Sequence, residues 1–412
     1  MLIAGISSLN PVAIDAFLPA MPAIAHSMAI DPGALGVTLG IFTFGTAIGQ
    51  IIFGPVSDRF GRKPVIVFGL SLYIVTALLA AYATNIETLS IIRFVQGIAA
   101  ASGRILGVAI ARDLYEREKA AKFLSNIWTI STAMPIVNPF IGSALISYFH
   151  WSSIFIYMAV FAGLMIVLMV FFFKETLVEK NPNALDASHI LTNFGQIASN
   201  RTFMVYALCA AASSSALYAF LSAASDILIT QLKQDPATFA WEFSVVMLGS
   251  MTGSFISGRL SSRLKINQVI SIGVTITAIF GTTLLLLSLN GVFTVAAIVI
   301  PFALHRIGES IILAQSMAGA ITPFRTAPGR LPHYWDLSAK PSELGARIYE
   351  KENAEGWDFI RKSSKHEFVE MNKADLQKSL NIWKTTSKEM IAETTARGVP
   401  AQKIVDRMLA AN

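Results

Sequence analysis

The chain of 412 residues has little charge and only one cysteine. Charged residues make up 14% of it and apolar residues 54%, whereas soluble domains carry about 25% charged residues. Together with a mean hydropathy of +0.57, this composition indicates a membrane protein. The single cysteine, Cys209, excludes an internal disulfide and a cysteine-based metal site, and its apolar setting favours packing between helices.

Signatures of enzymes are also missing. The sequence contains no glycine-rich phosphate loop with a lysine, no metal-ligand spacing and no nucleophile elbow. We therefore expect no catalytic residues, no metal and no cofactor, and an ion gradient as the energy source. The net charge of +6 does not require a nucleic-acid partner, because basic loops that face anionic lipid account for it.

Long apolar runs fill the first part of the chain. Residues 1–324 hold 31 of the 58 charged residues, and the last 88 residues hold the other 27. A helix needs about 20 apolar residues to cross a bilayer. The expected spans are 2–24, 34–56, 64–84, 89–111, 123–147, 151–173, 203–225, 238–258, 268–289 and 293–316. The predicted fold class is an all-α membrane protein of about ten transmembrane helices with a soluble helical tail.

Basic residues in the loops predict the orientation of the chain. The loops alternate between a basic set and a set on the opposite side whose only Lys or Arg is Lys233. Because Lys and Arg mark the cytoplasmic side, we expect the basic loops and the N-terminus to lie in the cytoplasm. Ten crossings return the tail to the cytoplasm. The basic set contains Arg59, Arg62, Lys63, Arg112, Arg117, Lys119, Lys122, Lys174, Lys180, Arg201, Arg259, Arg263 and Lys265.

The loop after the second expected helix reads GPVSDRFGRKP, from Gly54 to Pro64. We expect Gly54 and Pro55 to end the helix with a bend, and Asp58 to pair with a cation or a helix N-terminus. The pattern closely resembles the loop signature of the major facilitator superfamily. That resemblance implies a conformational-switch loop whose residues are Gly54, Asp58, Arg59, Gly61, Arg62 and Lys63.

A fainter copy of this loop lies 204 residues further on, where GRLSSRLKIN begins at Gly258. Parallel repeats of this kind are typical of such transporters. The fold implied is two bundles of six helices, of which this chain supplies six plus four, so the last two are missing. The predicted domains are a six-helix bundle at 1–173, a cytoplasmic central loop at 174–201, an incomplete bundle at 202–324 and a charged tail at 325–412.

Four further stretches resemble Bcr/CflA-type drug:proton antiporters. They are IDAFLPAMPAI (Ile14 to Ile24), RFVQG (Arg93 to Gly97), ARD (Ala111 to Asp113) and MPIVNPFIG (Met134 to Gly142). The resemblance implies a monomeric, multi-pass transporter of the bacterial inner membrane. It implies export of small amphiphilic, drug-like compounds in exchange for protons by alternating access, and an antiporter helix bent at Pro135 and Pro139 and closely packed at Gly142.

Asp15 is the first candidate for proton coupling. A charged residue inside a span costs about 2.5–3.5 kcal/mol on insertion scales, so Asp15 takes part either in proton or cation binding or in a structural pair. Arg93 and Arg104 lie three turns apart on one face of the fourth span. Arg93 matches an arginine of the family, whereas Arg104 departs from the family pattern and either pairs with Asp15 or faces a water-filled cleft.

Other polar residues inside spans have two interpretations each. Gln50 and Gln96 either line the transport path or bond neighbouring helices. Tyr218, with Phe220 and Asp226, either lines a drug path or packs. Glu309 lies four residues after His305 and three after Arg306, so these side chains can interact on one helix face, as a proton relay or as a structural cluster.

The stretch RTAPGRLPHYWDL (Arg325 to Leu337) stands where an eleventh helix is expected. Chains of the resembling type continue after TPF with a peptide such as PHRAGAASALLGF. Deleting the first base of one codon spelling of that peptide, chosen to fit, yields RTAPGRLPHYWD, and then Leu if the next base is a purine. A one-base frameshift, in the gene or in its sequencing, is therefore our hypothesis for the tail, and the DNA around the codon for Phe324 would decide it.

The end of the tail, Phe368 to Leu409, predicts amphipathic helices and resembles the C-terminus of TRAP-type solute-binding proteins, as in KHEFVEM (Lys365 to Met371). The predicted function is multidrug efflux by proton antiport. The alternatives are a truncated, transport-inactive member of the same family and a membrane-anchored module whose tail binds a partner.

Overall fold

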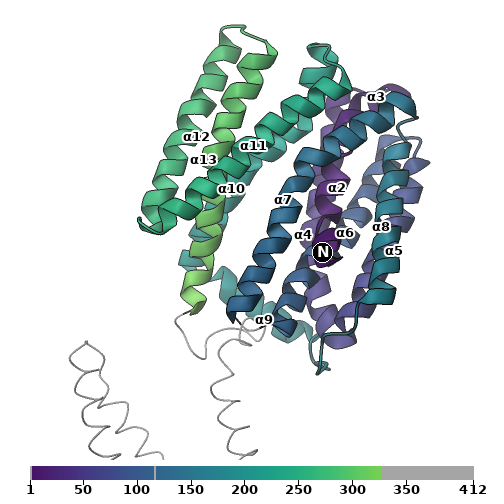
Figure 1. The fold of residues 1–412 in the computed structure, drawn as a ribbon, viewed down its shortest axis with the longest axis vertical. Coiled ribbons are helices and arrows are strands. Elements are labelled where there is room, and N and C mark those ends of the chain that lie inside the picture. The colour runs from purple at the N-terminus through teal and green to yellow at the C-terminus, as the bar shows by residue number, and fades with distance from the viewer. Residues whose placement is uncertain (1, 116, 326–412) are drawn as a thin grey trace, which may run out of the picture. The chain divides into compact units, whose positions relative to one another are not determined.

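The computed structural model describes residues 2–115 and 117–325, which form helices joined by short loops (Figure 1). The predicted all-α fold class is confirmed. The first half contains α1 (Leu2–Ser7), α2 (Leu9–Asp15), η1 (Leu18–Ala20), α3 (Met21–Ser27), η2 (Pro32–Leu35), α4 (Gly36–Phe60), α5 (Arg62–Ala81), α6 (Ile86–Leu114), α7 (Arg117–Tyr148) and α8 (Ser153–Phe172). The linker contains α9 (Ala187–Ala198), and the second half contains α10 (Arg201–Ser225), η3 (Asp226–Gln231), α11 (Pro236–Ser261), α12 (Ile266–Leu289) and α13 (Val295–Arg325).

Eight helices within the described residues are long and apolar enough to cross a membrane. They correspond to eight of the ten predicted spans. The other two predicted spans do not meet that criterion, for separate reasons. The first span is broken into short helices, and the fifth lies in α7, whose described apolar part, Ala133–Tyr148, is shorter than a bilayer needs.

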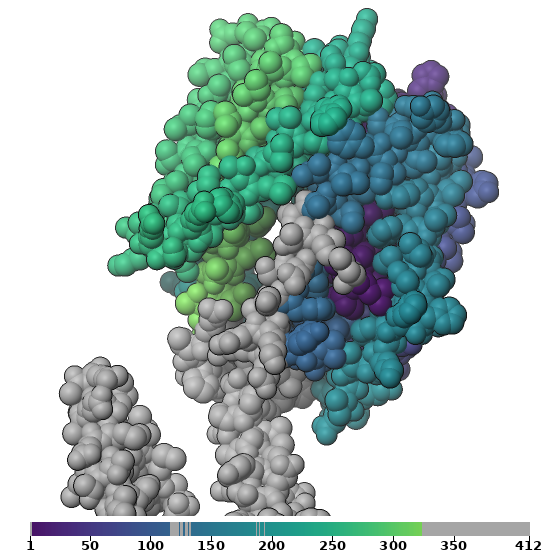
Figure 2. Space-filling model, in the orientation of Figure 1, coloured from purple at the N-terminus to yellow at the C-terminus, as the bar shows by residue number. Residues whose placement is uncertain are grey.

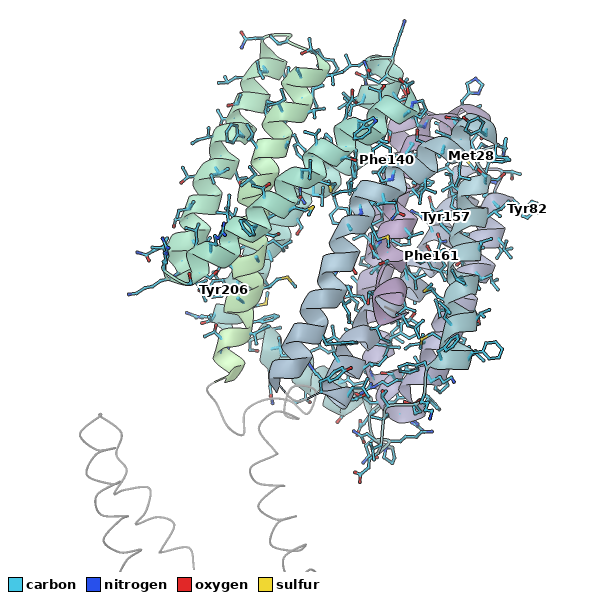
Figure 3. All side chains as sticks on the ribbon, in the orientation of Figure 1. Met28, Tyr82, Phe140, Tyr157, Phe161 and Tyr206 are labelled. Atoms are coloured by element: carbon cyan, nitrogen blue, oxygen red, sulfur yellow. The ribbon has the colours of Figure 1, made fainter. Side chains whose placement is uncertain are left out.

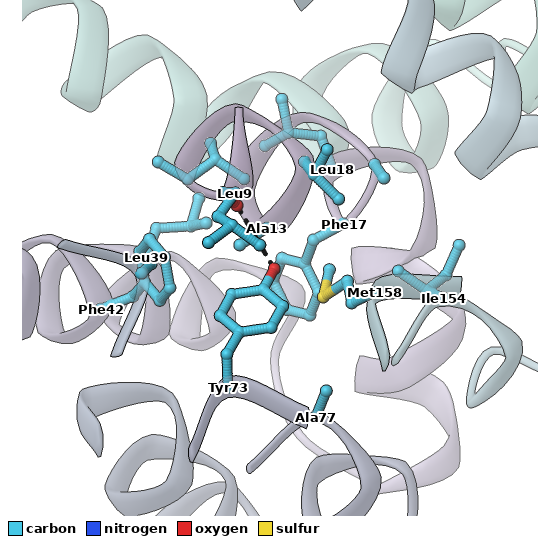
Figure 4. Packing of buried hydrophobic residues seen from close by; sticks show 14 of the residues in the cluster. Leu9, Ala13, Phe17, Leu18, Leu39, Phe42, Tyr73, Ala77, Ile154 and Met158 are labelled. Atoms are coloured by element: carbon cyan, nitrogen blue, oxygen red, sulfur yellow. Dashed lines mark hydrogen bonds between the residues drawn. The ribbon is translucent and has the colours of Figure 1, made fainter. Parts of the chain in front are cut away.

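The expectation of one continuous helix over 2–24 is wrong. The segment consists of α1, α2, η1 and α3, because Pro11, Pro19 and Pro22 cannot donate the backbone hydrogen bonds that a continuous helix requires. The Leu18 carbonyl, freed by Pro22, accepts instead from the Ser225 hydroxyl, and a further side-chain donor reaches the segment at Leu9. The Tyr73 hydroxyl donates to the Leu9 carbonyl at 3.3 Å in the packed interior of the first half (Figure 4). Such substitution lets a broken helix persist inside a membrane protein.

Helix starts and ends follow the local sequence. The Asn85 side chain accepts a hydrogen bond from the Thr88 amide at 2.8 Å at the start of α6, and Asn200 does the same for Phe203 at 3.0 Å at the start of α10. These are ordinary N-caps. The central loop also contains a helix that the sequence reasoning missed, α9, whose cap is Asp186.

The second half is organised around α13, which packs against α10, α11 and α12. By contrast, only 17% of the apolar window of α10 and 11% of that of α12 are buried, whereas the other candidate spans have 39–61% buried. The apolar faces of α10 and α12 therefore lack protein neighbours within the described residues. This agrees with the expectation that a four-helix bundle leaves helix surfaces without partners.

The two halves contact each other away from the GPVSDRFGRKP loop. The Ser225 hydroxyl donates to the Leu18 carbonyl at 2.5 Å, and the rings of Phe140 and Trp241 meet edge to face with their centres 4.9 Å apart. Figure 3 labels Phe140 on α7. In the space-filling view, the blue surface of α7 meets the green surface of α11 at the upper end (Figure 2). The halves are thus joined at one end in this conformation.

α13 ends at Arg325. The predicted tail beyond it, including RTAPGRLPHYWDL and the segment from Phe368 to Leu409, lies outside the described residues.

Candidate functional site

Asp15 is the last residue of α2 and lies where the first span breaks. The residue is 5% exposed, and its Oδ2 atom has no hydrogen-bond partner among the described residues. A buried ionised carboxylate without a partner is costly. Gly142 of α7 packs directly against the Ala16 carbonyl, where a Cβ atom would overlap it. The predicted close-packing role of Gly142 thus serves the segment that holds Asp15.

Arg93 of α6 stabilises the break in the first span. Its guanidinium donates to the Ala13 carbonyl at 2.9 Å and to the Gln96 side-chain oxygen at 2.9 Å. It also lies 4.7 Å from the ring centre of Phe17 and 4.5 Å from that of Phe42, which favours a cation. Arg93 is fully buried. It therefore positions the segment that carries Asp15 and does not face an open path.

Arg104 has the opposite environment on the same helix. It is exposed although it lies in the middle of α6 between the buried residues Gly103 and Leu106. A charged side chain in mid-membrane faces the bundle interior or water, not lipid. Arg104 interacts electrostatically with Tyr218 of the second half. It therefore faces the space between the halves.

Tyr218 of α10 is the residue that brings the candidates together. It lies within electrostatic range of Asp15, Arg104 and Arg306. No ion pair joins Asp15 to Arg104 in the described part of the chain, so the suggested direct pairing is absent in this conformation. Tyr218 lies near both instead.

The remaining predicted polar residues divide between packing and the site. Gln96 is fully buried, accepts from Arg93 and donates to the Met158 sulfur at 3.8 Å, so it bonds neighbouring helices. Gln50 is half-buried on α4. Phe220 stacks on Phe302 at 4.0 Å between ring centres, which is a packing contact.

A second group of ionisable residues lies on α13. Arg306 forms an ion pair with Glu309 and donates to the Ser250 hydroxyl of α11 at 2.9 Å. The His305 Nδ1 atom lies 4.0 Å from the Glu309 Oε2 atom. All three residues are less than 10% exposed. The predicted juxtaposition of these residues is therefore present, and it lies within reach of Tyr218 through Arg306.

The signature loop forms a compact ionic cluster. Arg62 donates to Asp58 at 2.5 Å, to the Ser57 hydroxyl at 2.6 Å and to Asp113 at 2.9 Å. Asp113 belongs to the ARD stretch at the end of α6 and also accepts from Thr176 at 3.2 Å. The predicted cation partner of Asp58 is thus Arg62. Arg59 is exposed, with its guanidinium 5.6 Å from the ring centre of Phe60.

The expectation that Gly54 and Pro55 end the helix is wrong, because α4 continues to Phe60 with Pro55 inside it. A proline removes one helical hydrogen bond, but prolines are tolerated inside transmembrane helices, and α4 continues through Pro55. The residue that ends α4 is Gly61, whose φ of 107° disfavours any residue with a Cβ. In α7, Pro135 and Pro139 lie inside a continuous helix, and the predicted bend at these residues stays a prediction.

Glu175 is the residue that sequence reasoning missed. Its carboxylate accepts from the backbone amides of Arg62 at 2.9 Å and Lys63 at 3.0 Å, at the start of α5. Lys63 in turn donates to the Val170 carbonyl at 2.9 Å. Partial desolvation acts to raise the pKa of Glu175, but its backbone hydrogen bonds outweigh that effect and lower it. A lone acid just after the sixth apolar run was the available signal.

Within residues 2–115 and 117–325, no three His, Cys, Asp or Glu side chains converge in a way that could hold a metal ion. The fold and site define a membrane protein of two helical halves, with buried ionisable groups at its centre and an ionic cluster at one end. These are features of a secondary transporter.

The chain belongs to the Major Facilitator Superfamily, whose sequence pattern matches residues 3–330. It is 30% identical over 285 residues to a bicyclomycin resistance protein homolog from Haemophilus influenzae, covering 69% of this chain and 71% of that protein. It is 26% identical over 321 residues to the multidrug resistance protein MdtL of Klebsiella pneumoniae, covering 78% and 80% of the two chains. The suspected family is therefore confirmed.

Solved structures agree on the fold. A bacterial homolog of the lysosomal transporter Spinster, inward-facing and unoccupied, matches with a TM-score of 0.62 and 14% identity, covering 83% of this chain and 77% of that one. The inward-open xylose transporter XylE from E. coli matches with a TM-score of 0.57 and 13% identity, covering 82% and 93%. The chain is thus a multi-pass membrane transporter and not an enzyme, in a family that runs on ion gradients without a cofactor.

Proposed function

We propose that this protein exports small, amphiphilic, drug-like compounds across the bacterial inner membrane as a monomer, in exchange for protons. The drug-resistance names of its relatives support the substrate class. The basic loops support an orientation with the N-terminus and the signature loop in the cytoplasm. The ionisable groups inside the spans support coupling to protons.

The observation that carries the proposal is the placement of Asp15. Its carboxyl group is buried at a break in the first span, Oδ2 is unpartnered, and Tyr218 of the other half lies near it. A carboxyl group so placed can exchange a proton when the contact between the halves changes. Arg104 is exposed on the same side, and its interaction with Tyr218 would change with that contact.

The distribution of contacts between the halves supports transport by alternating access. Ser225, Leu18, Phe140 and Trp241 join them at one end. The ionic cluster around Arg62 lies at the other end and connects α4, α5 and α6 within the first half. We infer that the first half rocks as a unit, opening the end at Ser225 while the end that carries the signature loop closes.

Drug accumulation in intact cells tests this function. Cells that express the chain should hold less of a fluorescent cationic dye than cells with an empty vector, and a protonophore should abolish the difference. The Asp15→Asn variant, expressed at an equal level in the membrane, should accumulate dye like the empty-vector cells. Full efflux by Asp15→Asn, with unchanged sensitivity to the protonophore, would refute the proposed role of Asp15.

A transport-inactive chain is the alternative that one observation favours, namely the sparse burial of α10 and α12. If faces that a complete bundle would cover are left to lipid, the second half could lack the rigidity that alternating access requires. In that case no substrate of any charge would be exported, with or without the tail after Arg325. A partner-binding role would instead appear as specific capture of a protein by residues 325–412.

A further inference from the structure

We propose that His305, Arg306 and Glu309 form a second proton-binding site in the second half of the transporter, so that two protons bind in each transport cycle. The link to transport rests on the proposed function above, whereas proton binding by the cluster can be measured without any substrate.

The cluster lies deep in α13, far from either end of the helix. Glu309 is 1% exposed, and neither of its carboxylate oxygens has a hydrogen-bond partner by geometry, although Arg306 lies in ion-pair contact with one of them. The Nδ1 atom of His305 lies 4.0 Å from the other oxygen and has no hydrogen-bond partner itself. Two protonatable atoms are therefore neighbours, at a separation slightly beyond hydrogen-bonding distance.

This arrangement differs from a structural ion pair in the same protein. In the signature-loop cluster, Asp113 accepts well-formed hydrogen bonds from both Arg62 and Thr176. A buried pair stabilises a fold only when its remaining lone pairs are satisfied. Glu309 retains unused acceptor capacity next to an imidazole. A proton held by Glu309 or His305 would form a hydrogen bond between them once the two side chains, now 4.0 Å apart, move closer, which makes the cluster suited to binding a proton.

The neighbouring helices add few competing charges. α12 contributes no titratable side chain, and its Thr277 hydroxyl lies next to Gly308. α11 contributes the Ser250 hydroxyl, which accepts from Arg306, and Glu242, more than two helical turns earlier. α10 contributes the Ser213 hydroxyl, which donates to the Glu309 carbonyl at 3.1 Å, and Tyr218, which interacts with Arg306. The immediate charge balance is set by the cluster itself.

Proton uptake changes the charge of the cluster by one unit. With Glu309 ionised and His305 neutral, the pair with Arg306 has no net charge. With the proton bound, the cluster carries one positive charge, and Arg306 is held by Ser250 and lies within electrostatic range of Tyr218. Because Tyr218 also interacts with Asp15 and Arg104, the two proton sites would sense each other through it. A cationic substrate would be repelled in the protonated state, as exchange requires.

Infrared difference spectroscopy on the full-length protein in lipid tests the proposal directly. Moving from mildly alkaline to mildly acidic buffer should produce carboxyl C=O stretching bands from groups that take up protons. Glu309→Gln should remove one component, Asp15→Asn should remove another, and the double variant should lack both. His305→Gln should shift the Glu309 component. A Glu309→Gln spectrum identical to that of the unmodified protein would overturn the proposal.

Two controls keep the result interpretable. Glu242→Gln changes a different buried carboxyl group of the second half and should leave the Glu309 component in place. Glu309→Asp retains a carboxyl group, so its component should move and not vanish, which excludes simple misfolding. If the bands behave as expected but a cationic dye such as ethidium is not exported, the efflux function fails while the second proton site stands.

Discussion

Two arginines of one helix show how residue type and spacing leave the role of a side chain open. Arg93 and Arg104 have the same helical phase in the sequence, yet Arg93 is fully buried and Arg104 is exposed. The difference arises from the broken first span, whose Ala13 carbonyl requires a donor beside Arg93. The break and its partners depend on tertiary packing, so sequence reasoning could nominate both residues but could not separate them.

A structural role for Arg93 predicts a loss of stability when it is replaced. In Arg93→Gln, the Ala13 carbonyl loses its donor and the space between Phe17 and Phe42 is left underfilled. We expect the free energy of unfolding to fall by about 2–4 kcal/mol, measured by unfolding in mixed detergent micelles. Arg104→Gln should change it little. An Arg93→Gln protein as stable as the unmodified chain would contradict this role.

Glu175 predicts a specific response to pH. Its backbone hydrogen bonds hold the pKa of its carboxyl group below the ordinary value of 4.5. The stabilisation it gives is therefore complete above that value and is lost only as the pH falls through the lowered pKa. Glu175→Gln should lower the melting temperature at neutral pH, and the difference from the unmodified protein should shrink in strongly acidic buffer.

Glu179 provides the matched control, because it is exposed in the same loop and accepts no hydrogen bond in the structure described. Glu179→Gln should leave the melting temperature unchanged at either pH. Equal effects of the two substitutions would mean that loop charge, and not the contact with the start of α5, determines the stability.

At the scale of elements, the broken first span is held by very close helix packing. A Cβ atom at Gly103 of α6 would overlap the Ile6 carbonyl oxygen of α1, whereas a Cβ atom at Gly163 of α8 would meet nothing within 4 Å. Small residues at such positions let transmembrane backbones approach each other. The packing of α1 against α6 is thus decided by a single missing methyl group.

Gly103 and Gly163 predict opposite effects of a glycine-to-alanine substitution on the free energy of unfolding. Gly103→Ala should lower the free energy of unfolding by about 1–3 kcal/mol because α1 must move away, and it should impair transport by displacing Asp15. Gly163→Ala should raise it by about 0.5–1 kcal/mol, since alanine favours the helix. Both are measured by the same detergent unfolding. Similar changes for the two variants would contradict the packing described.

Most spans could be predicted from apolar length alone, because a membrane core requires it. The exceptions have physical reasons. The first span breaks where prolines remove donors, but α4 continues through Pro55 and α7 through Pro135 and Pro139. A proline's effect on a helix depends on which neighbours satisfy the freed carbonyl, and those neighbours come from distant parts of the sequence.

At the scale of the whole molecule, transport by alternating access requires the contact between the halves to open. In a Cys209→Ser background, cysteines at Phe140 and Trp241 joined by a short, reducible bifunctional reagent should block transport, and reduction should restore it, because the ring contact there joins the halves. Cysteines at Tyr206 and Asn267 join α10 to α12 within one half, and their cross-link should leave transport active. Transport that survives the first cross-link would exclude rocking about this contact.

The candidate site was partly predictable for a related reason. Charged residues in apolar spans are costly, so Asp15 and Glu309 could be identified from the sequence. Tyr218, which lies near Asp15, Arg104 and Arg306, could be named only as one of several aromatic candidates. Its role arises from the approach of two halves far apart in the sequence, which no local pattern encodes.

The central claim is that export is driven by protons through Asp15. The most direct measurement uses proteoliposomes with an acidic lumen that contains a trapped pH dye. On addition of ethidium, we predict that the lumen becomes alkaline as the compound accumulates, and that Asp15→Asn shows neither change. Accumulation of ethidium without any movement of protons in the unmodified protein would contradict the account.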